Sequence, residues 1–166
     1  MEIATFAGGC FWCGEAVFIR LKGVSKVTSG YTGGEIANPS YEQVTTGSTG
    51  HAEAIQIEFD PKIISYQKLL EVFFATHDPT TLNQQGADMG TQYRSVIFYH
   101  DDNQKKEAQG FIKGKVVTKV ERIGKFYPAE SYHKDYYETH KDALYCKIVI
   151  DPKIQKLYRD FKEDLK

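Results

Sequence analysis

The order in which strands and helices are expected along the chain limits its fold more than any other feature of the sequence. Residues 2–7 (EIATFA) predict a strand that ends at Gly8-Gly9, and the apolar spacing from Cys10 predicts an amphipathic helix that closes at Gly23. A second strand is expected over residues 24–31. The loop after it, about twenty residues rich in Gly, Ser, Thr, Asn and Pro, is long enough to suggest a functional segment.

The next part of the chain repeats this order. Residues 53–59 alternate as a strand, Ser65 is expected to cap a helix over 66–76, and a loop over 77–90 leads to a strand over 94–99. Two strand–helix–strand units in this order are typical of the split βαβ, or ferredoxin-like, arrangement. We therefore predict an α+β fold, a two-layer sandwich with a ferredoxin-like (split βαβ) core, long loops and a C-terminal extension.

The C-terminal extension carries two helix signals. Residues 131–140 predict a short aromatic helix, and Asp151-Pro152 predicts an N-cap followed by proline at the first helical position. The helix after Pro152 has one apolar stripe, which we expect to pack on the body of the protein without a chemical role. The stripe consists of Ile154, Leu157, Tyr158, Phe161 and Leu165.

Length and charge exclude several classes of protein. A chain of 166 residues buries roughly 70% of its unfolded surface, so its core needs no disulfides. With 21 Lys+Arg against 22 Asp+Glu, it has no general attraction to nucleic acid or to an anionic membrane. No apolar run approaches the roughly 20 residues that span a bilayer. The N-terminus has Glu2 where a secretion signal has basic residues. We expect one cytoplasmic domain over residues 1–166, with no nucleic-acid or membrane partner.

Three cysteines are too few and too uneven for a secreted disulfide framework or for a four-cysteine zinc site. Cys10 and Cys13 are three apart, and Cys146 lies far along the chain. His133 and His140 are seven apart and fit ordinary helix positions better than a zinc-binding pair. We therefore expect no metal. In a reducing compartment, the Cys-x-x-Cys spacing favours redox or nucleophilic chemistry.

Cys10 is expected where a strand gives way to a helix. A thiolate there faces free backbone N–H groups and the positive end of the helix dipole, which stabilises an anion by about 0.3–1 kcal/mol, up to ~2 when partly buried. We therefore expect a lowered thiol pKa. Phe11 and Trp12 separate the two cysteines. An aromatic cage beside a nucleophilic sulfur suits a small apolar group such as a methyl, although the same residues would equally fit a core.

Gly9-Cys10-Phe11-Trp12 resembles the signature of the A-type peptide methionine sulfoxide reductases. Further blocks resemble that family in the same order, and the match runs from about Thr5 to Ile150, nearly the whole chain. These blocks are Ser29-Gly30-Tyr31-Thr32-Gly33-Gly34, Asn38-Pro39-Ser40-Tyr41, Gly50-His51-Ala52-Glu53-Ala54, His77-Asp78-Pro79-Thr80, Gly90-Thr91-Gln92-Tyr93-Arg94-Ser95 and Tyr132-His133-Lys134-Asp135-Tyr136.

The resemblance implies an activity: the S epimer of methionine sulfoxide, free or in proteins, is reduced to methionine through a Cys10 sulfenic acid and an intramolecular disulfide, which repairs oxidised proteins. By resemblance, Cys10 is the nucleophile and Glu53 the acid. Tyr41 and Tyr93 match the phenols that hydrogen-bond the substrate oxygen. A glutamic acid donates a proton at neutral pH only where burial raises its pKa.

The resemblance also assigns a substrate pocket. Phe11 and Trp12 match the wall that holds the substrate's methyl group, and Asp88 matches a supporting polar residue. The residues themselves argue less strongly for these roles. Glu53 begins an alternating strand, where a solvated side chain is the usual outcome, and an aspartate beside glycines is often a turn residue.

The residues leave the resolving thiol open. Cys146 resembles the C-terminal resolving cysteine of many family members, whereas Cys13 occupies a position that is often glycine. A Cys-x-x-Cys pair at a helix start can form a disulfide within one turn, so Cys13 can resolve directly and Cys146 can pass the disulfide outward. The sequence favours Cys146, with Cys13 as a participant or an alternative. Thioredoxin or another dithiol is the external reductant that the resemblance suggests, with no metal or nucleotide cofactor.

Two other functions compete with this interpretation. A general protein-disulfide oxidoreductase would use Cys10 and Cys13, but it gives Phe11, Trp12 and Glu53 no purpose. A peptide-binding module would leave the cysteines packed and inert. Reactivity of Cys10 toward iodoacetamide near neutral pH distinguishes the enzyme from the binding module.

Overall fold

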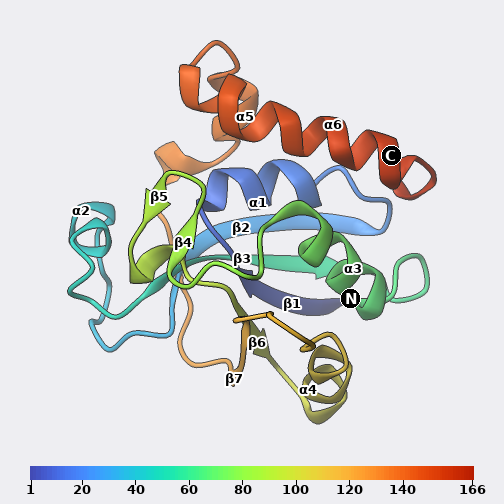
Figure 1. The fold of residues 1–166 in the computed structure, drawn as a ribbon, viewed down its shortest axis with the longest axis horizontal. Coiled ribbons are helices and arrows are strands. Elements are labelled where there is room, and N and C mark those ends of the chain that lie inside the picture. Colours follow the sequence, from blue (N-terminus) through green and yellow to red (C-terminus); the bar gives the residue numbers. More distant parts are fainter.

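A six-stranded sheet forms the centre of the protein in the computed structural model, which describes residues 1–166 (Figure 1). Its four inner strands are neighbours in the order β6-β1-β3-β2 and are antiparallel throughout, while β7 adds in parallel at one edge and β8 pairs with β2 at the other. The strands are β1 (Glu2–Ala7), β2 (Val24–Thr32), β3 (Ala52–Phe59), β6 (Val96–Tyr99), β7 (Lys119–Arg122) and β8 (Tyr127–Pro128).

The two crossover helices confirm the predicted α+β class. Helix α1 (Phe11–Phe18) joins β1 to β2, and α3 (Tyr66–Thr76) lies between β3 and β6. In each unit one strand separates the two that the helix connects, which is the split βαβ, ferredoxin-like arrangement. Ser65 caps α3 as predicted, since its hydroxyl accepts a hydrogen bond from the Lys68 N–H at 3.0 Å.

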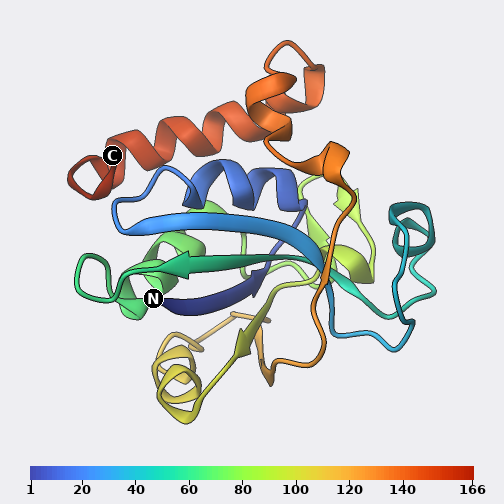
Figure 2. The same ribbon diagram turned by 180° about the vertical axis from the view of Figure 1, so that it is seen from behind.

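The remaining elements surround the sheet and its two crossover helices (Figures 1 and 2). They are α2 (Tyr41–Thr45), the hairpin β4 (Gln84–Gln85) and β5 (Asp88–Met89), α4 (Asp102–Gln109), α5 (Tyr136–Thr139), a π-helical turn (Cys146–Ile150), α6 (Asp151–Asp160), and 3₁₀ turns at Thr91–Tyr93, Ser131–His133 and Lys162–Asp164.

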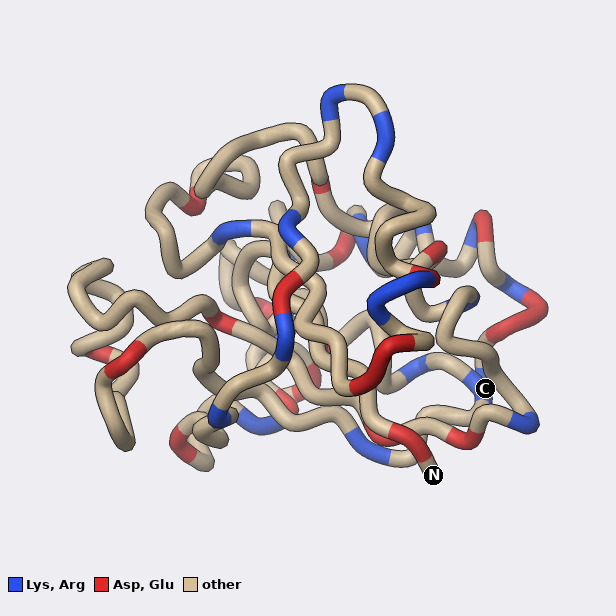
Figure 3. The backbone as a smooth tube through the Cα atoms, turned by 90° about the horizontal axis from the view of Figure 1, so that it is seen from below, with Lys and Arg blue, Asp and Glu red and all other residues tan.

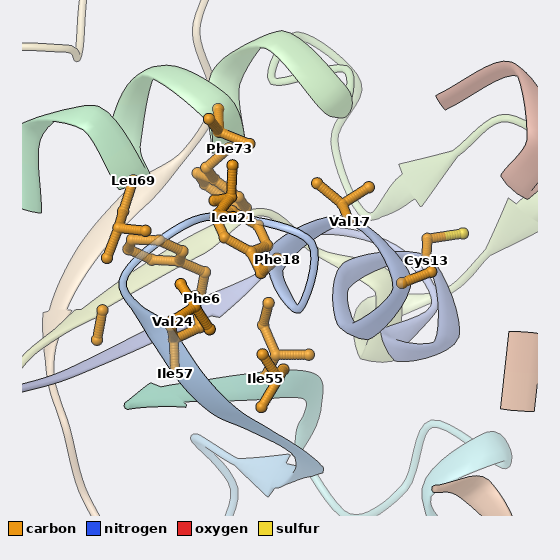
Figure 4. Packing of buried hydrophobic residues seen from close by; sticks show 14 of the residues in the cluster. Phe6, Cys13, Val17, Phe18, Leu21, Val24, Ile55, Ile57, Leu69 and Phe73 are labelled. Atoms are coloured by element: carbon orange, nitrogen blue, oxygen red, sulfur yellow. The ribbon is translucent and has the colours of Figure 1, made fainter. Parts of the chain in front are cut away.

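The main hydrophobic core lies between the sheet and its helices. Phe6 of β1 stacks on Phe73 of α3, with ring centroids 4.8 Å apart, and also packs against Phe18 of α1 at 5.8 Å. Cys13 lies at the edge of this core, with its sulfur turned away from the aromatic rings (Figure 4). Helix α6 covers α1 (Figures 1 and 2). The outer side of α1 is therefore enclosed by the C-terminal extension, as the predicted apolar stripe requires.

A smaller cluster covers the opposite face of the sheet. It consists of Ala7, Ala52, Ala54, Val96 and Phe98. Ile123 and Phe126, from the segment that joins β7 to β8, pack against it. Both faces of the central strands are therefore closed, which leaves the ends of the strands as the place where side chains can meet a substrate.

Helix α1 is shorter than the sequence predicts. It ends at Phe18 rather than at Gly23, and Leu21 instead forms an isolated antiparallel bridge with Leu165 near the C-terminus. The predicted long loop also contains a short helix, α2, which Ser40 and Gln43 cap reciprocally. The early end of α1 arises from a contact distant in sequence, and α2 arises from its caps. The spacing of apolar residues predicts neither.

The predicted N-cap at Asp151 is wrong. Asp151 lies inside a continuous helical run, because the π-helical turn Cys146–Ile150 leads directly into α6. Pro152 lacks an N–H, and its ring collides with the carbonyl four residues earlier in regular α geometry. A widened turn just before the proline removes this conflict. Tyr158 of the predicted stripe is exposed, whereas Ile154, Leu157 and Leu165 are buried.

Charged residues of both signs are interspersed along the chain (Figure 3). None of the helices combines the length and the apolar character needed to cross a membrane.

Candidate active site

Cys10 lies at the turn between β1 and α1 and is the N-cap residue of the helix. Cys10 is buried, with 8% of the residue exposed. Gly9 precedes it with φ +87°, and a Cβ at that position would lie 2.9 Å from Cγ of Gln85. Only glycine suits this turn, because it tolerates the left-handed backbone and the close approach of the β4 side chain.

Glu53 lies beside this turn with a buried side chain, 1% exposed, on β3. Its Oε1 accepts a hydrogen bond from the Phe11 N–H at 3.1 Å, while its Oε2 is buried without a partner. Burial raises the pKa of Glu53 to about 8, and the nearby Asp88 carboxylate adds to the rise. The side chain is therefore a protonated acid at neutral pH, in the dry surroundings that proton donation requires.

The predicted lowering of the Cys10 pKa is wrong. Burial raises the pKa of Cys10 well above its usual value, and Glu53 and then Cys13 raise it further. Loss of hydration outweighs the helix dipole here, because the dipole contributes at most about 2 kcal/mol in partly buried sites. The Cys10 thiol is therefore protonated before substrate binds, and it becomes a nucleophile only when the bound substrate changes its surroundings.

Tyr41, the first residue of α2, and Tyr93, in the 3₁₀ turn Thr91–Tyr93, both lie near the same acid. Burial and then Glu53 raise the pKa of both phenols, which keeps them protonated hydrogen-bond donors. Glu130 fixes Tyr41, since one carboxylate oxygen accepts the Tyr41 N–H at 2.9 Å and the other accepts the Tyr31 hydroxyl at 2.9 Å. Tyr93 is held by the Gly9 N–H, which donates to its carbonyl at 3.2 Å.

Phe11 and Trp12 belong to an aromatic wall rather than to the core alone. The Trp12 ring stacks on Tyr136 with centroids 3.7 Å apart and planes 6° from parallel. Trp12 Nε1 donates to His133 Nδ1 at 3.0 Å, and the His133 ring packs against Phe11 at 5.0 Å and Tyr41 at 4.6 Å. These contacts hold the indole and the phenyl ring beside Cys10 in fixed orientations.

His133 and Tyr136 were missed by the sequence analysis, which treated His133 as an ordinary helix residue. The segment forms a 3₁₀ turn and then takes a left-handed backbone at Asp135 (φ +53°), and the rings of His133 and Tyr136 both pack against Trp12. Buried Glu15 anchors this segment, because its carboxylate accepts the Asp135 N–H at 2.7 Å and the Ser29 hydroxyl at 3.1 Å. In the sequence, the concentration of aromatic residues in the family block 132–136 is the feature that could have indicated a role for these two residues in the site.

Asp88 lies on β5 and completes the site. Its Oδ2 accepts a hydrogen bond from the Tyr145 hydroxyl at 2.6 Å, and the same hydroxyl lies 3.9 Å from the Cys13 sulfur. The charge of Asp88 raises the pKa of Glu53, so Asp88 influences the acid as well as the surroundings of the Cys13 thiol. Among the sequence-predicted residues, Glu53, Tyr41, Tyr93 and Asp88 lie around the Cys10 turn with Phe11 and Trp12, whereas Cys146 does not line this site.

The three cysteines are free and buried, and they are not equivalent. Cys10 and Cys13 line the same two cavities, whereas Cys146 is 0% exposed and lines neither. Cys146 is a neighbour of Cys13 and helps to raise its pKa. No group of three or more His, Cys, Asp or Glu side chains is arranged to hold a metal ion.

Substituting His133→Phe is expected to loosen Trp12 while keeping the aromatic packing. The loss of one buried acceptor costs about 0.5–1.5 kcal/mol, so we expect kcat/KM to fall about 2- to 13-fold. Trp12 is the only tryptophan in the chain, so its fluorescence reports on this site alone. Red-shifted emission and lower anisotropy would accompany the loss. Unchanged emission and an unchanged kcat/KM would show that the hydrogen bond is unimportant.

The chain matches known proteins over its whole length. The family model described as peptide methionine sulfoxide reductase matches residues 2–165. A relative from Sulfolobus acidocaldarius, named peptide methionine sulfoxide reductase MsrA, is 55% identical over 98% of this chain and 97% of its own. The reduced form of Mxr1 from Saccharomyces cerevisiae is 36% identical with a TM-score of 0.79, over 87% of this chain and 88% of that one. A structure of Mxr1 in complex with Trx2 gives a TM-score of 0.54 at 27% identity, over 81% and 84%.

The fold, the free cysteines and these matches define a thiol-dependent oxidoreductase. The chain belongs to the peptide methionine sulfoxide reductase family. It reduces methionine sulfoxide to methionine and thereby repairs oxidised protein.

Proposed function

We propose that Cys10 is the nucleophile of this reductase and that Glu53 is its acid. The Cys10 sulfur attacks the sulfoxide sulfur, and Glu53 donates a proton to the sulfoxide oxygen. The attack forms a bond between the two sulfurs. The protonated oxygen then moves to the Cys10 sulfur while the substrate S–O bond and the new S–S bond break, so methionine leaves and Cys10 remains as a sulfenic acid. The thiol proton of Cys10 restores the Glu53 acid, so atoms and charge balance. Cys10 sulfur is oxidised and the substrate sulfur is reduced.

The observation that carries this proposal is the unpaired Oε2 of Glu53. A buried polar oxygen without a partner is costly and needs an explanation. Here it belongs to a carboxyl group that is protonated at neutral pH and lies beside the buried Cys10 sulfur. A sulfoxide oxygen bound there would accept the missing hydrogen bond, and the phenols of Tyr41 and Tyr93 would supply further donors as negative charge grows on that oxygen.

We assign the substrate's methyl group to the aromatic wall of Phe11 and Trp12. Sulfoxide sulfur is a stereocentre with an oxygen, a methyl group and the methionine chain. If the oxygen meets Glu53 and the methyl meets the wall, only one epimer directs its chain outward. By family resemblance, that epimer is S, and a chain that exits to solvent allows free methionine sulfoxide as well as peptides and proteins to bind.

For the recycling half, we propose that Cys13 resolves the Cys10 sulfenic acid first and that Cys146 accepts the disulfide second. Cys13 is one helical turn from Cys10 and shares both of its cavities. Cys146 is fully buried and is a neighbour of Cys13, through the turn that carries Tyr145. This differs from the preference for Cys146 that the sequence suggested.

Disulfide mapping after one equivalent of methionine sulfoxide, without reductant, tests this order. Early quenching should trap Cys10–Cys13, and later time points should show Cys13–Cys146 with Cys10 reduced again. In Cys13→Ser the first equivalent of methionine should form at an unchanged rate, while the sulfenic acid persists and reacts with dimedone. A Cys10–Cys146 bond at the earliest time point in the unsubstituted protein would contradict the order.

We further propose that a thioredoxin or another small dithiol reduces the final disulfide, without a metal or prosthetic cofactor. The complex of the related Mxr1 with Trx2 supports this reductant. We also propose that residues 1–166 act as one domain, because a single cluster of 30 buried residues draws on β1, α1, α3 and α6 alike. The cytoplasmic location expected from the sequence stays a prediction.

The chemistry of the site disfavours a general protein-disulfide oxidoreductase. Such an enzyme has no use for a buried acid or for a wall that holds a methyl group. Reduction of insulin disulfides, measured beside reduction of a methionine sulfoxide peptide, separates the two activities. We expect the peptide to be reduced and insulin to remain intact.

A further inference from the structure

Lys153 lies in the first turn of α6 and faces the thiols. Its half-buried side chain lines the narrow cavity of about 30 Å³ beneath α1, together with Cys10, Cys13 and Glu53. It also lines the neighbouring hollow of about 610 Å³, where Cys10 and Cys13 form part of the wall. No carboxylate lies within salt-bridge distance of its ammonium group. This cation is therefore free to act on the Cys13 sulfur, and it is not among the groups that shift the pKa of Cys10.

The position of Lys153 matters because of its effect on the pKa of the Cys13 thiol. Burial raises the pKa of the Cys13 thiol, and Lys153 is the strongest influence in the opposite direction, ahead of the Tyr145 hydroxyl. Asp88 and Cys146 raise the pKa slightly further. Among these neighbours Lys153 is the one cation.

Other titratable groups on these cavities do not replace Lys153. His77 at the end of α3 lines both cavities, but burial lowers its pKa to about 4, so it is neutral at physiological pH. Glu53 is protonated at physiological pH and carries no charge. Asp78 and Lys156 line only the larger hollow. Lys156 therefore offers a matched control, since it lies one turn further along α6.

We propose that Lys153 is a positioning residue for the recycling half of the reaction, and that its ammonium group stabilises the Cys13 thiolate that attacks the Cys10 sulfenic acid. This inference rests on the proposed role of Cys13. In the step, the Cys13 thiolate attacks the Cys10 sulfur, an S–S bond forms, and the S–O bond breaks. The leaving hydroxide takes up a proton and becomes water. Because a thiolate is the attacking species, a nearby cation raises the fraction that reacts.

The test measures the pH dependence of iodoacetamide alkylation at Cys13. A Cys10→Ser background isolates Cys13 in the N-terminal tryptic peptide, and Cys146 is followed in its own peptide. Removing a neighbouring charge at a partly buried site shifts a thiol pKa by roughly 0.5–1 unit, so Lys153→Met should slow alkylation at pH 7 about 3- to 10-fold. Lys153→Arg should retain most of the rate, and Lys156→Met should match the parent. An unchanged profile in Lys153→Met, or an equal shift in Lys156→Met, would overturn the proposal.

A second measurement uses the protein with Cys10 intact. In a single turnover, Lys153→Met should release the first equivalent of methionine at the normal rate and form the Cys10–Cys13 disulfide about 3- to 10-fold more slowly. Equal slowing of both steps would indicate a structural defect and overturn the proposal. Absence of the methionine burst in the unsubstituted protein would instead refute the proposed function, so the two failures are distinguishable.

Discussion

Cys10→Ser is expected to abolish methionine formation, with a loss of turnover of at least about 10³-fold in the presence of excess dithiothreitol. A serine hydroxyl is far less nucleophilic than a thiol toward sulfoxide sulfur, and its oxygen cannot carry the sulfenic acid through which the cycle proceeds. Glu53 cannot act as a base that would activate an alcohol, because it is protonated at neutral pH. Methionine released from a sulfoxide peptide, quantified by chromatography, measures the effect.

Cys146→Ser is the matched control for this substitution. It removes another buried thiol but leaves the first chemical step intact, so one equivalent of methionine should still form per protein. Retained multiple turnover in Cys10→Ser would show that another group attacks the substrate. Equal loss of the first equivalent in both variants would point to a folding defect, which circular dichroism would reveal.

Glu53→Gln is expected to slow the reduction step about 10²- to 10⁴-fold, the usual contribution of a general acid. Glutamine keeps the size of the side chain and its acceptor for the Phe11 N–H, so the fold and the wall stay in place. Only the transferable proton is lost. Stopped-flow measurement of Trp12 fluorescence during a single turnover reports the step directly.

The pH profile provides the sharper form of this test. In the unsubstituted protein, the rate of the reduction step should fall as pH rises through about 8, because Glu53 then loses the proton that it donates. In Glu53→Gln this decline should be absent. A tyrosine substitution such as Tyr41→Phe should lower the rate while keeping the decline near pH 8. A decline that persists unchanged in Glu53→Gln would remove Glu53 from the role of acid.

Glu53→Gln should also stabilise the protein at neutral pH. The folded-state pKa of about 8 lies above the ordinary value, so the folded protein binds the proton more tightly than the unfolded chain does. The benefit of this protonation is complete below about pH 4 and is lost progressively as pH rises to about 8. Glutamine has no proton to lose. We expect a gain on the order of a few kcal/mol at pH 8 in urea unfolding, and none at pH 4.

The order of elements was predictable because it rests on local properties. Ser65 supplies a cap, the apolar spacing of α3 indicates one buried face, and β1 ends where two glycines follow. The end of α1 was not predictable, since Leu21 leaves the helix to pair with Leu165. Contacts between residues that are distant in sequence have no periodic signal.

Glu53 shows the same limit within the site. Alternation in a strand predicts a solvated side chain, yet Ala52, Glu53, Ala54 and Ile55 are all buried. The strand β3 lies at the centre of the sheet, between β1 and β2, and both of its faces are covered. Its topology, and not its own sequence, removes Glu53 from water and raises its pKa.

The sequence by itself determined the fold class, the family and the set of reactive groups, because these depend on local spacing and on motifs that can be read in order along the chain. The tertiary structure decided which of those groups act together. Burial reversed the expected pKa of Cys10, the 3₁₀ turn Ser131–His133 brought His133 to Trp12, and the packing of α6 on α1 placed Lys153 beside Cys13. Hydration and electrostatic interactions depend on neighbours in space, and only the folded chain specifies those neighbours.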